Sequence, residues 1–207
     1  MKKKKLVYGL GINDADYAVE KCETISYENG KQKRKLVWIC PFYCKWRDML
    51  RRCYSAKWQE KYPTYIGCSV CKDWLVFSNF KHWMEKQDWE GKQLDKDLLL
   101  QGNEVYSPRA CVFVDKKVNL FVTERNASRG RLMIGVCWHR GANKFQALCG
   151  DGSGKQKHLG LFDTEIEAHK AWLAFKLEQA KILAAEQTDT RVAKALVDRY
   201  ENYDLQE

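Results

Sequence analysis

The segment from Gly135 to Leu177 constrains the fold more than any other part of the chain. Apolar and polar residues alternate there in three short runs: 134–139, 144–149 and 155–162. The turn-forming sequences RGAN and GDGSG separate these runs, which is the pattern of consecutive antiparallel strands. Thr164 and Glu167 then have the capping-box spacing that begins a helix. The segment therefore predicts a three-stranded antiparallel sheet packed on one helix.

A match to a known family is carried by the run HLG-x-FDTEIEAHKAW and by residues of the first two strands: Gly135, Val136, Trp138, His139, Lys144, Phe145 and Ala147. Through these residues and their spacing, the segment resembles the DNA-binding domain of plant ethylene-response factors, the Apetala-two domain. Relatives of that domain also occur fused to phage and mobile-element endonucleases. The resemblance implies a sheet that lies in the major groove of DNA. The plant family has several arginines and a tryptophan on the DNA-facing side. At or near those positions this chain has Cys137, His139, Gln156 and His158 instead, so its base preference stays open.

Strand alternation divides the side chains of the expected strands between two faces. One set should mostly pack against the helix or its edges: Val136, Trp138, Phe145, Ala147, Leu159 and Phe162. The other set should face outward: Cys137, His139, Lys144, Gln146, Gln156 and His158. Three further cations near the turns should meet phosphates: Arg140, Lys155 and Lys157. Glutamine and histidine can read base edges, whereas lysine and arginine mainly position a protein on the DNA backbone.

Positive charge is unevenly distributed along the chain, whose formal net charge is +9. Residues 31–57 contain nine Lys/Arg and one acid, and residues 125–158 contain seven and one. Lys2–Lys5 add four more, whereas 186–207 has six acids and three bases. Clustered positive charge favours double-stranded DNA as partner, because each phosphate contact releases counterions; a solvated, solubilising surface is the alternative. The linker 125–131 could reach into a minor groove or simply connect two modules.

The N-terminal half is expected to contain a basic arm and two amphipathic helices. The arm, residues 1–41, has weak strand patterns: 6–10, 22–27 and 35–39. After Pro41, apolar residues recur at helical spacing: Trp46, Met49, Leu50, Cys53 and Tyr54. The rest of that helix surface is basic and supplies three candidate phosphate contacts: Arg47, Arg51 and Arg52. A second helix is expected over 72–86, with these residues facing inward: Trp74, Phe77, Phe80, Trp83 and Met84.

A second group of motifs covers about 42–122. Its members are Trp46-x2-Met49-Leu50-x-Arg52-Cys53-Tyr54, Val70-Cys71-x2-Trp74-x2-Phe77-x2-Phe80, Leu94-Asp95-Lys96, Gly102-Asn103 and Tyr106-Ser107-Pro108-x2-Cys111. In this order they resemble a phage and bacterial branch of the HNH-type nucleases. Such nucleases build their site on a hairpin followed by a helix. Here the hairpin would use strands near 94 and at 111–114, and the helix would follow Asp115 as its cap.

This resemblance implies a one-metal site, which needs oxygen ligands for Mg²⁺ or Mn²⁺ and a histidine to activate water. Asp95 falls on the acidic ligand position and Asn119 near the final ligand. Lys96 stands where the general-base histidine would be, and Ala110 or Cys111 near the orienting asparagine. A lysine base would need a strongly lowered pKa. We therefore expect a degenerate HNH-like module in which Asp95, Lys96 and Asn119 are the candidate catalytic residues.

Nine cysteines and the lack of a signal-like apolar segment favour reduced thiols in a cytoplasmic protein, in the host cytoplasm if a phage encodes it. Cys40-x3-Cys44 and Cys68-x2-Cys71 could supply four thiolates to zinc. Several other cysteines lie in apolar settings, so buried core thiols are expected and structural zinc is not. No apolar run reaches the roughly 18 residues of a membrane span, so no membrane partner is expected.

Together these features predict an α+β chain with four regions: a basic arm (1–41), an HNH-like module with flanking helices (42–124), an Apetala-two-like DNA-binding domain (130–186), and a final helix with an acidic tail (187–207). The expected function is DNA binding of a phage type, with a sheet that reads the groove. Two alternatives stay open. One is an active, metal-dependent homing-type endonuclease, and the other is a phage factor that binds a host protein.

Overall fold

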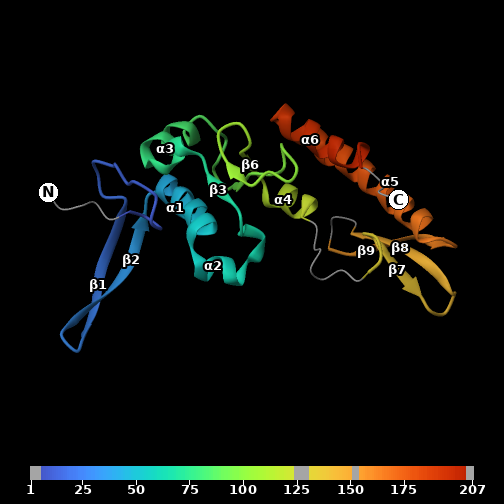
Figure 1. The fold of residues 1–207 in the computed structure, drawn as a ribbon, viewed down its shortest axis with the longest axis horizontal. Coiled ribbons are helices and arrows are strands. Elements are labelled where there is room, and N and C mark those ends of the chain that lie inside the picture. The colour runs from blue at the N-terminus through green and yellow to red at the C-terminus, as the bar shows by residue number, and fades with distance from the viewer. Residues whose placement is uncertain (1–5, 124–130, 151–153, 204–207) are drawn as a thin grey trace. The chain divides into compact units, whose positions relative to one another are not determined.

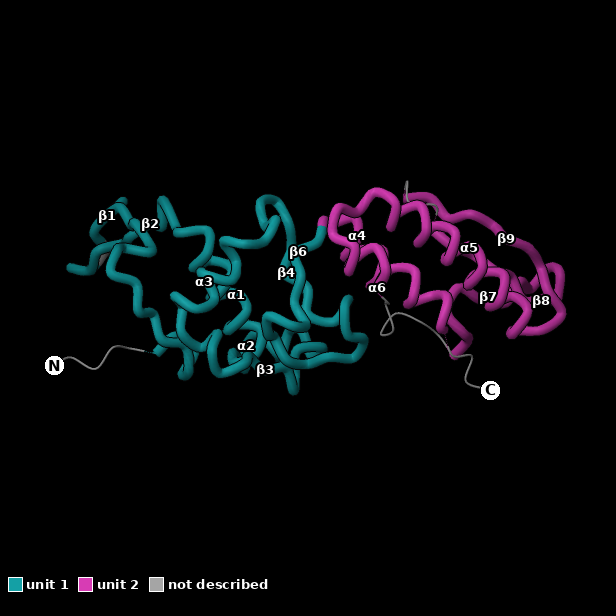
Figure 2. The backbone as a smooth tube through the Cα atoms, turned by 90° about the horizontal axis from the view of Figure 1, so that it is seen from above, with its two compact units in different colours: residues 1–114 teal, residues 115–207 magenta. Residues whose placement is uncertain are grey.

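The computed structural model of the chain describes residues 6–123, 131–150 and 154–203. Two basic segments noted in the sequence, Lys2–Lys5 and most of the linker 125–131, lie outside the described residues. The fold is α+β (Figure 1). The chain divides into two compact units, residues 1–114 and 115–207 (Figure 2).

The first unit combines short helices with pairs of strands. Its elements in chain order are β1 (Glu20–Glu28), β2 (Lys31–Ile39), α1 (Pro41–Tyr54), α2 (Ala56–Lys61), η1 (Pro63–Tyr65), β3 (Ser69–Val70), η2 (Lys72–Leu75), α3 (Phe77–Met84), β4 (Gln93–Asp95), β5 (Val105–Tyr106) and β6 (Val112–Val114). β1 pairs with β2 and β4 with β6 in antiparallel fashion, whereas β3 and β5 are parallel.

Helix α1 is the centre of the first unit's core. Pro41 stands at its first turn, where the missing N–H of proline has no intrahelical partner to lose. The buried stripe is the one that the sequence predicts, with Tyr43 added and Tyr54 only half-buried: Tyr43, Trp46, Met49, Leu50 and Cys53. Trp46 is fully buried, and its indole N–H donates to the carbonyl of Trp74 at 2.7 Å. This bond fixes η2, which contains Trp74, on α1.

The expected continuous helix over 72–86 is wrong, because the chain breaks at Val76. A short 3₁₀ turn, η2, precedes that residue, and α3 begins after it. Ile12 accepts the N–H of Phe77 at 3.0 Å and donates to the carbonyl of Leu75 at 2.7 Å, so the N-terminal arm bonds to the groups that a helix would use. The predicted inward residues are nevertheless buried, except for the half-buried Trp83.

The N-terminal arm also differs from its expected strands. Residues 6–10 form only an isolated bridge between Val7 and Gly11 rather than a strand. The other two strands are longer than the sequence patterns, and together they form the ribbon β1–β2.

The second unit holds the three-stranded sheet. Its elements are α4 (Lys116–Val122), β7 (Val136–His139), β8 (Lys144–Gly150), β9 (Gln156–Phe162), α5 (Glu165–Ala185) and α6 (Thr190–Glu201). The sheet is antiparallel in the order β7-β8-β9. Helix α4 belongs to this unit, where Lys176 donates to the carbonyl of Phe121 at 3.0 Å and Tyr200 packs edge-on against the Phe121 ring. Asp115 precedes α4 as expected, but its side chain makes no capping hydrogen bond.

The predicted capping box begins α5. Thr164 accepts the N–H of Glu167 at 3.2 Å, and Glu167 accepts the N–H of Thr164 at 3.1 Å. Trp172 of this helix packs onto Gly135 at the entry to β7. Gly135 has φ +81°, and a Cβ there would lie 2.1 Å from Cγ of Trp172. Only glycine therefore allows the helix to approach the sheet this closely.

Candidate nucleic-acid interface

The candidate interface is the face of the β7–β9 sheet that α5 leaves uncovered. α5 packs against the other face, where Ala147 is fully buried and Trp172 nearly so (Figure 1). The register assigns these cross-strand neighbours to the uncovered face: Cys137 with Gln146, His139 with Lys144, and Leu148 with His158. One face therefore gathers most of the polar side chains that the sequence predicts to contact DNA. We call it the outer face.

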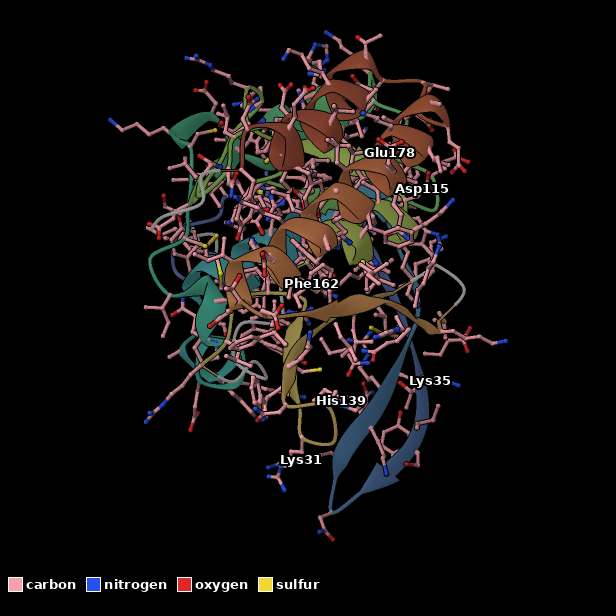
Figure 3. The ribbon with its side chains drawn as sticks, turned by 90° about the vertical axis from the view of Figure 1, so that its right-hand side faces the viewer. Lys31, Lys35, Asp115, His139, Phe162 and Glu178 are labelled. Carbon is pink, nitrogen blue, oxygen red and sulfur yellow. The ribbon has the colours of Figure 1, made fainter. Side chains whose placement is uncertain are left out.

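His139 has a defined hydrogen-bonding state at the tip of the β7–β8 hairpin (Figure 3). Its Nδ1 accepts the backbone N–H of Ala142 at 3.0 Å. A neutral imidazole has one acceptor and one donor nitrogen, so in the neutral ring the proton lies on Nε2. The side chain is exposed. Its Nε2–H is therefore a donor that an acceptor on a base edge can reach.

Lys144 forms an ion pair on the outer face. Its Nζ lies 3.0 Å from Oδ1 of Asp163, and the two side chains are 42% and 81% exposed. The pairing of Phe145 with Phe162 brings Asp163, the next residue, beside Lys144. Exposed ion pairs contribute only about 0–1 kcal/mol, so a phosphate can replace Asp163 at small cost. Asp163 is not among the site residues predicted from the sequence, because only the strand register brings it to this lysine.

Gln146 occupies the middle of the outer face, on the central strand β8. It is half-buried between its cross-strand neighbours Cys137 and Leu161. The Cys137 thiol lies 3.5 Å from the amide oxygen and donates to it. This contact occupies the oxygen, so the NH₂ group is the part of Gln146 that can donate to a base.

The register between β8 and β9 shifts at Leu148, in the way that a β-bulge produces, and this shift decides which residues of β9 lie on the outer face and which on the helix side. His158 lies opposite Leu148 on the outer face. Lys157 lies opposite the buried Cys149, and its Nζ is 4.7 Å from the centre of the Phe175 ring on α5. The ammonium of Lys157 is thus on the helix side of the sheet, whereas the sequence predicted a phosphate contact for it. Arg140, Lys155 and Gln156 are exposed, as a phosphate or base contact requires.

Trp138 is more exposed than its expected place against the helix or its edges implies. It is 44% exposed and meets the Phe145 ring edge-on, with 4.9 Å between ring centres. α5 contacts the end of the sheet that holds Gly135 and Cys149. Trp138 lies toward the opposite end, near the hairpin tip, and so the helix does not cover it.

Two of the three α1 arginines lie at the surface with acidic neighbours. Arg47 forms an ion pair with Glu20 at the start of β1. Arg51 lies 3.2 Å from Asp48, and its guanidinium lies 4.0 Å from the centre of the Trp58 ring. Both side chains are about one-third exposed, so these arginines remain candidate phosphate contacts.

Arg52 points into the first unit instead. Its guanidinium lies 3.5 Å from both the carbonyl of Leu94 and the hydroxyl of Tyr106. Lys45, on the same helix, donates to the carbonyl of Lys92 at 2.6 Å. Burial and the charge of Arg52 lower the pKa of Lys45. These two cations hold the segment that leads into β4. Their contacts within the unit account for both side chains, so neither needs a phosphate as partner.

Asp95, the candidate metal ligand, ends β4 and is almost fully buried. Its Oδ1 accepts the N–H groups of Asp97 at 2.9 Å and of Leu98 at 2.7 Å. Burial, with the charge of Asp97, raises the pKa of this carboxyl, and the two N–H donors offset part of that rise. The side chain therefore fixes the loop that follows β4.

Lys96, the residue at the general-base position, donates to Oδ2 of Asp97 at 3.1 Å and to the carbonyl of Asn103 at 2.7 Å. Burial alone would lower the pKa of Lys96, but the charge and hydrogen bond of Asp97 outweigh it, and the pKa is raised. A general base needs the opposite shift. Asn119 lies on α4 in the second unit.

These surroundings do not fit a divalent metal ion. Asp95 already accepts two backbone N–H groups, and the Lys96 ammonium lies close by. Within the part of the chain that the structure describes, no three or more His, Cys, Asp or Glu side chains are grouped so that they could hold a metal. All nine cysteines are free. Burial raises the pKa of Cys53 and Cys111 to about 12, as for unreactive core thiols.

Among the described residues, none of the helices combines the length and the apolar character that crossing a membrane requires. Comparison of the chain with protein-family models, with curated proteins and with solved structures found no match.

Proposed function

We propose that the second unit binds double-stranded DNA through the outer face of the β7–β9 sheet. The observation that carries the proposal is the one-sided cover by α5, which leaves a row of polar side chains on the other face: His139, Lys144, Gln146, Gln156 and His158. Three strands about 4.8 Å apart span roughly 10 Å. The major groove is about 12 Å wide, so the sheet has the size to enter it.

The polar side chains divide into two chemical roles. His139 and Gln146 each have an N–H donor left over after their contacts within the sheet, which suits acceptors on base edges. Lys144 is suited to a phosphate, because its present partner Asp163 is exposed and easily replaced. Arg140 directly follows β7 and Lys155 directly precedes β9, and both side chains are exposed. They are therefore suited to contact phosphates at the edges of the groove.

The proposal does not include cleavage of DNA. A metal-dependent cut of the HNH kind would need a base that is deprotonated at neutral pH, and the raised pKa of Lys96 opposes this. It would also need Asp95 as a metal ligand, although this side chain is engaged in its own loop. We therefore regard the HNH-like module as a scaffold in the proposed function.

The test measures binding and its salt dependence by fluorescence anisotropy, with a labelled pool of duplexes of random sequence as probe. Each phosphate that the protein neutralises contributes about 0.9 to the slope of log affinity against log salt concentration. Lys144→Ala combined with His158→Ala should weaken binding and reduce that slope by about 0.9. Lys157→Ala is the matched control, since it removes a lysine from the same sheet but from its helix side.

We expect the Lys157→Ala protein to keep the slope of the wild type. No binding by the wild type, or an affinity that salt does not change, would reject the proposal. An equal loss of slope in the Lys157→Ala protein would show that the outer face is not the surface that DNA contacts.

A further inference from the structure

One row of side chains on the outer face crosses all three strands of the sheet. Cys137 on β7 lies opposite Gln146 on β8, and Gln146 lies opposite Leu161 on β9. Directly opposite residues of antiparallel strands point to the same face, and their Cβ atoms are about 4.5–5.5 Å apart. The three side chains are therefore close neighbours on one surface, and we call them the middle row.

Cys137 fixes the direction of the Gln146 amide. The thiol donates to the amide oxygen at 3.5 Å, so this oxygen is turned toward β7. The oxygen and nitrogen of an amide lie on opposite sides of its carbon, so the NH₂ group is turned away from Cys137. Of the groups that the structure describes, none accepts a hydrogen bond from this NH₂ group. Gln146 therefore offers a partner its donors and keeps its oxygen within the sheet.

Leu161 is the apolar member of the middle row. Its side chain is 38% exposed on the outer face. The preceding residue, Gly160, lies opposite the fully buried Ala147 on the side that α5 covers, so Leu161 points the other way. An exposed leucine gains free energy when it contacts another apolar group. The middle row thus presents an N–H donor directly beside an apolar side chain.

One base matches a donor that stands beside an apolar group. In the major groove, thymine presents the O4 acceptor and, on the adjacent ring carbon, the C5 methyl group. Cytosine presents an N4 donor instead, which the NH₂ group of Gln146 would oppose. Guanine has acceptors but no methyl group, and adenine requires the glutamine oxygen as well as its NH₂ group. Thymine alone uses both the donor and the leucine.

We infer that the middle row reads thymine. Gln146 donates to O4, and Leu161 contacts the C5 methyl group. Cys137 is the positioning residue that keeps the amide in this orientation. The inference rests on the proposed function, because the outer face must enter the major groove before these groups can meet. It adds the identity of a base and the residues that select it.

Uracil substitution tests the methyl contact without any change to the protein. Duplexes that bind are selected from a random-sequence pool and sequenced. Each thymine of the selected site is then replaced by uracil, which keeps O4 and lacks only the methyl group. We expect one of these replacements to weaken binding about fourfold, as the loss of one buried methyl group does.

The uracil experiment separates the inference from the proposed function. A selected site without thymine, or equal affinity for thymine and uracil at every position, would overturn the inference and leave the proposed function standing. If the wild type binds no duplex of the pool, the proposed function is rejected and the inference is rejected with it.

Leu161→Ala tests whether this leucine makes the methyl contact. The ratio of the affinities for thymine and uracil should fall from about four toward about one, because the apolar surface that meets the methyl group is removed. Leu120→Ala is the matched control, since it removes a leucine that is 58% exposed on α4 of the same unit. It should keep the ratio of the wild type. An unchanged ratio in the Leu161→Ala protein would overturn the inference, provided that thermal unfolding shows an intact fold.

A 5-methylcytosine duplex tests the role of Cys137. At the thymine that the uracil series identifies, a G·5-methylcytosine pair keeps the methyl group but puts an N4 donor in place of O4. The wild type should bind this duplex about tenfold more weakly, because two donors then face each other. In the Cys137→Ala protein the amide can turn its oxygen to the N4 donor, so the discrimination should largely disappear. Cys137→Ser keeps a donor and should retain it. Equal discrimination in the Cys137→Ala protein and the wild type would overturn the role assigned to Cys137.

Discussion

Asp163→Asn should strengthen DNA binding, because Asp163 holds the lysine that the proposed interface would offer to a phosphate. The Nζ of Lys144 lies 3.0 Å from Oδ1 of Asp163, and this carboxylate is 81% exposed beside the outer face. DNA must replace Asp163 at Lys144 and must also approach its negative charge. The amide keeps the size of the side chain and removes both obstacles.

The size of the effect follows from the exposure of the pair. An ion pair between exposed side chains contributes at most about 1 kcal/mol, and about 1.4 kcal/mol corresponds to a tenfold change in affinity. Release of Lys144 should therefore tighten binding about two- to fivefold. The gain should fall as salt rises, because screening weakens both the ion pair and the phosphate contact.

A double-mutant cycle tests the reasoning by anisotropy at fixed salt. Asp163→Asn is measured in the wild type and in the Lys144→Ala protein, where no ammonium remains to be released. Most of the gain should disappear in the second background. An equal gain in both backgrounds would show that Asp163 acts only through the general field, and weaker binding by Asp163→Asn would refute the assignment of Lys144 to a phosphate.

Three other predictions concern the fold and the candidate nuclease site. Gly135→Ala should lower the free energy of unfolding of the second unit by about 2–5 kcal/mol, from backbone strain at φ +81° and overlap with Trp172; thermal unfolding by circular dichroism measures it, and an unchanged midpoint would contradict it. The side-chain hydrogen bond from Arg191 lowers the pKa of Asp189, the cap of α6. The stabilisation that the ionised Asp189 side chain gives to the folded state is therefore fully present above the ordinary pKa of 3.8, and it is lost as pH falls through the lower folded-state pKa. Asp189→Ala should therefore lower the free energy of unfolding by about 1 kcal/mol at pH 7 and by less at about pH 3, as measured by urea unfolding. Supercoiled plasmid should stay intact with Mg²⁺ or Mn²⁺, and nicking that Asp95→Ala abolishes would reverse our interpretation of that site.

Elements with a local physical signal could be predicted from the sequence. The apolar stripe of α1 and the capping box of α5 depend on residues a few positions apart, so spacing alone identifies them. The three strands of the sheet follow in the same way, because alternation and the intervening turns lie within one short segment. The inward direction of Arg52, by contrast, depends on carbonyl and hydroxyl groups more than 40 residues away.

Long-range contacts also explain the break in the helix expected over 72–86. Local propensity and apolar spacing favour a continuous helix there, but Ile12 supplies hydrogen bonds to both sides of Val76. A residue more than 60 positions away thus decides the local structure. The spacing of the buried residues survives the break, so the core could be predicted although the helix could not.

The register shift at Leu148 has a consequence for the charge of the proposed interface. It puts His158 on the outer face and the ammonium of Lys157 on the helix side, so the proposed DNA-binding face has one lysine fewer than the sequence indicates. Lys144 is partly neutralised by Asp163. The outer face therefore offers more hydrogen-bonding groups than unpaired charge, which suits reading of bases better than strong attachment to phosphates. Attachment then needs cations beyond Lys144, and the exposed side chains of Arg140 and Lys155, which flank strands of the same sheet, can supply them.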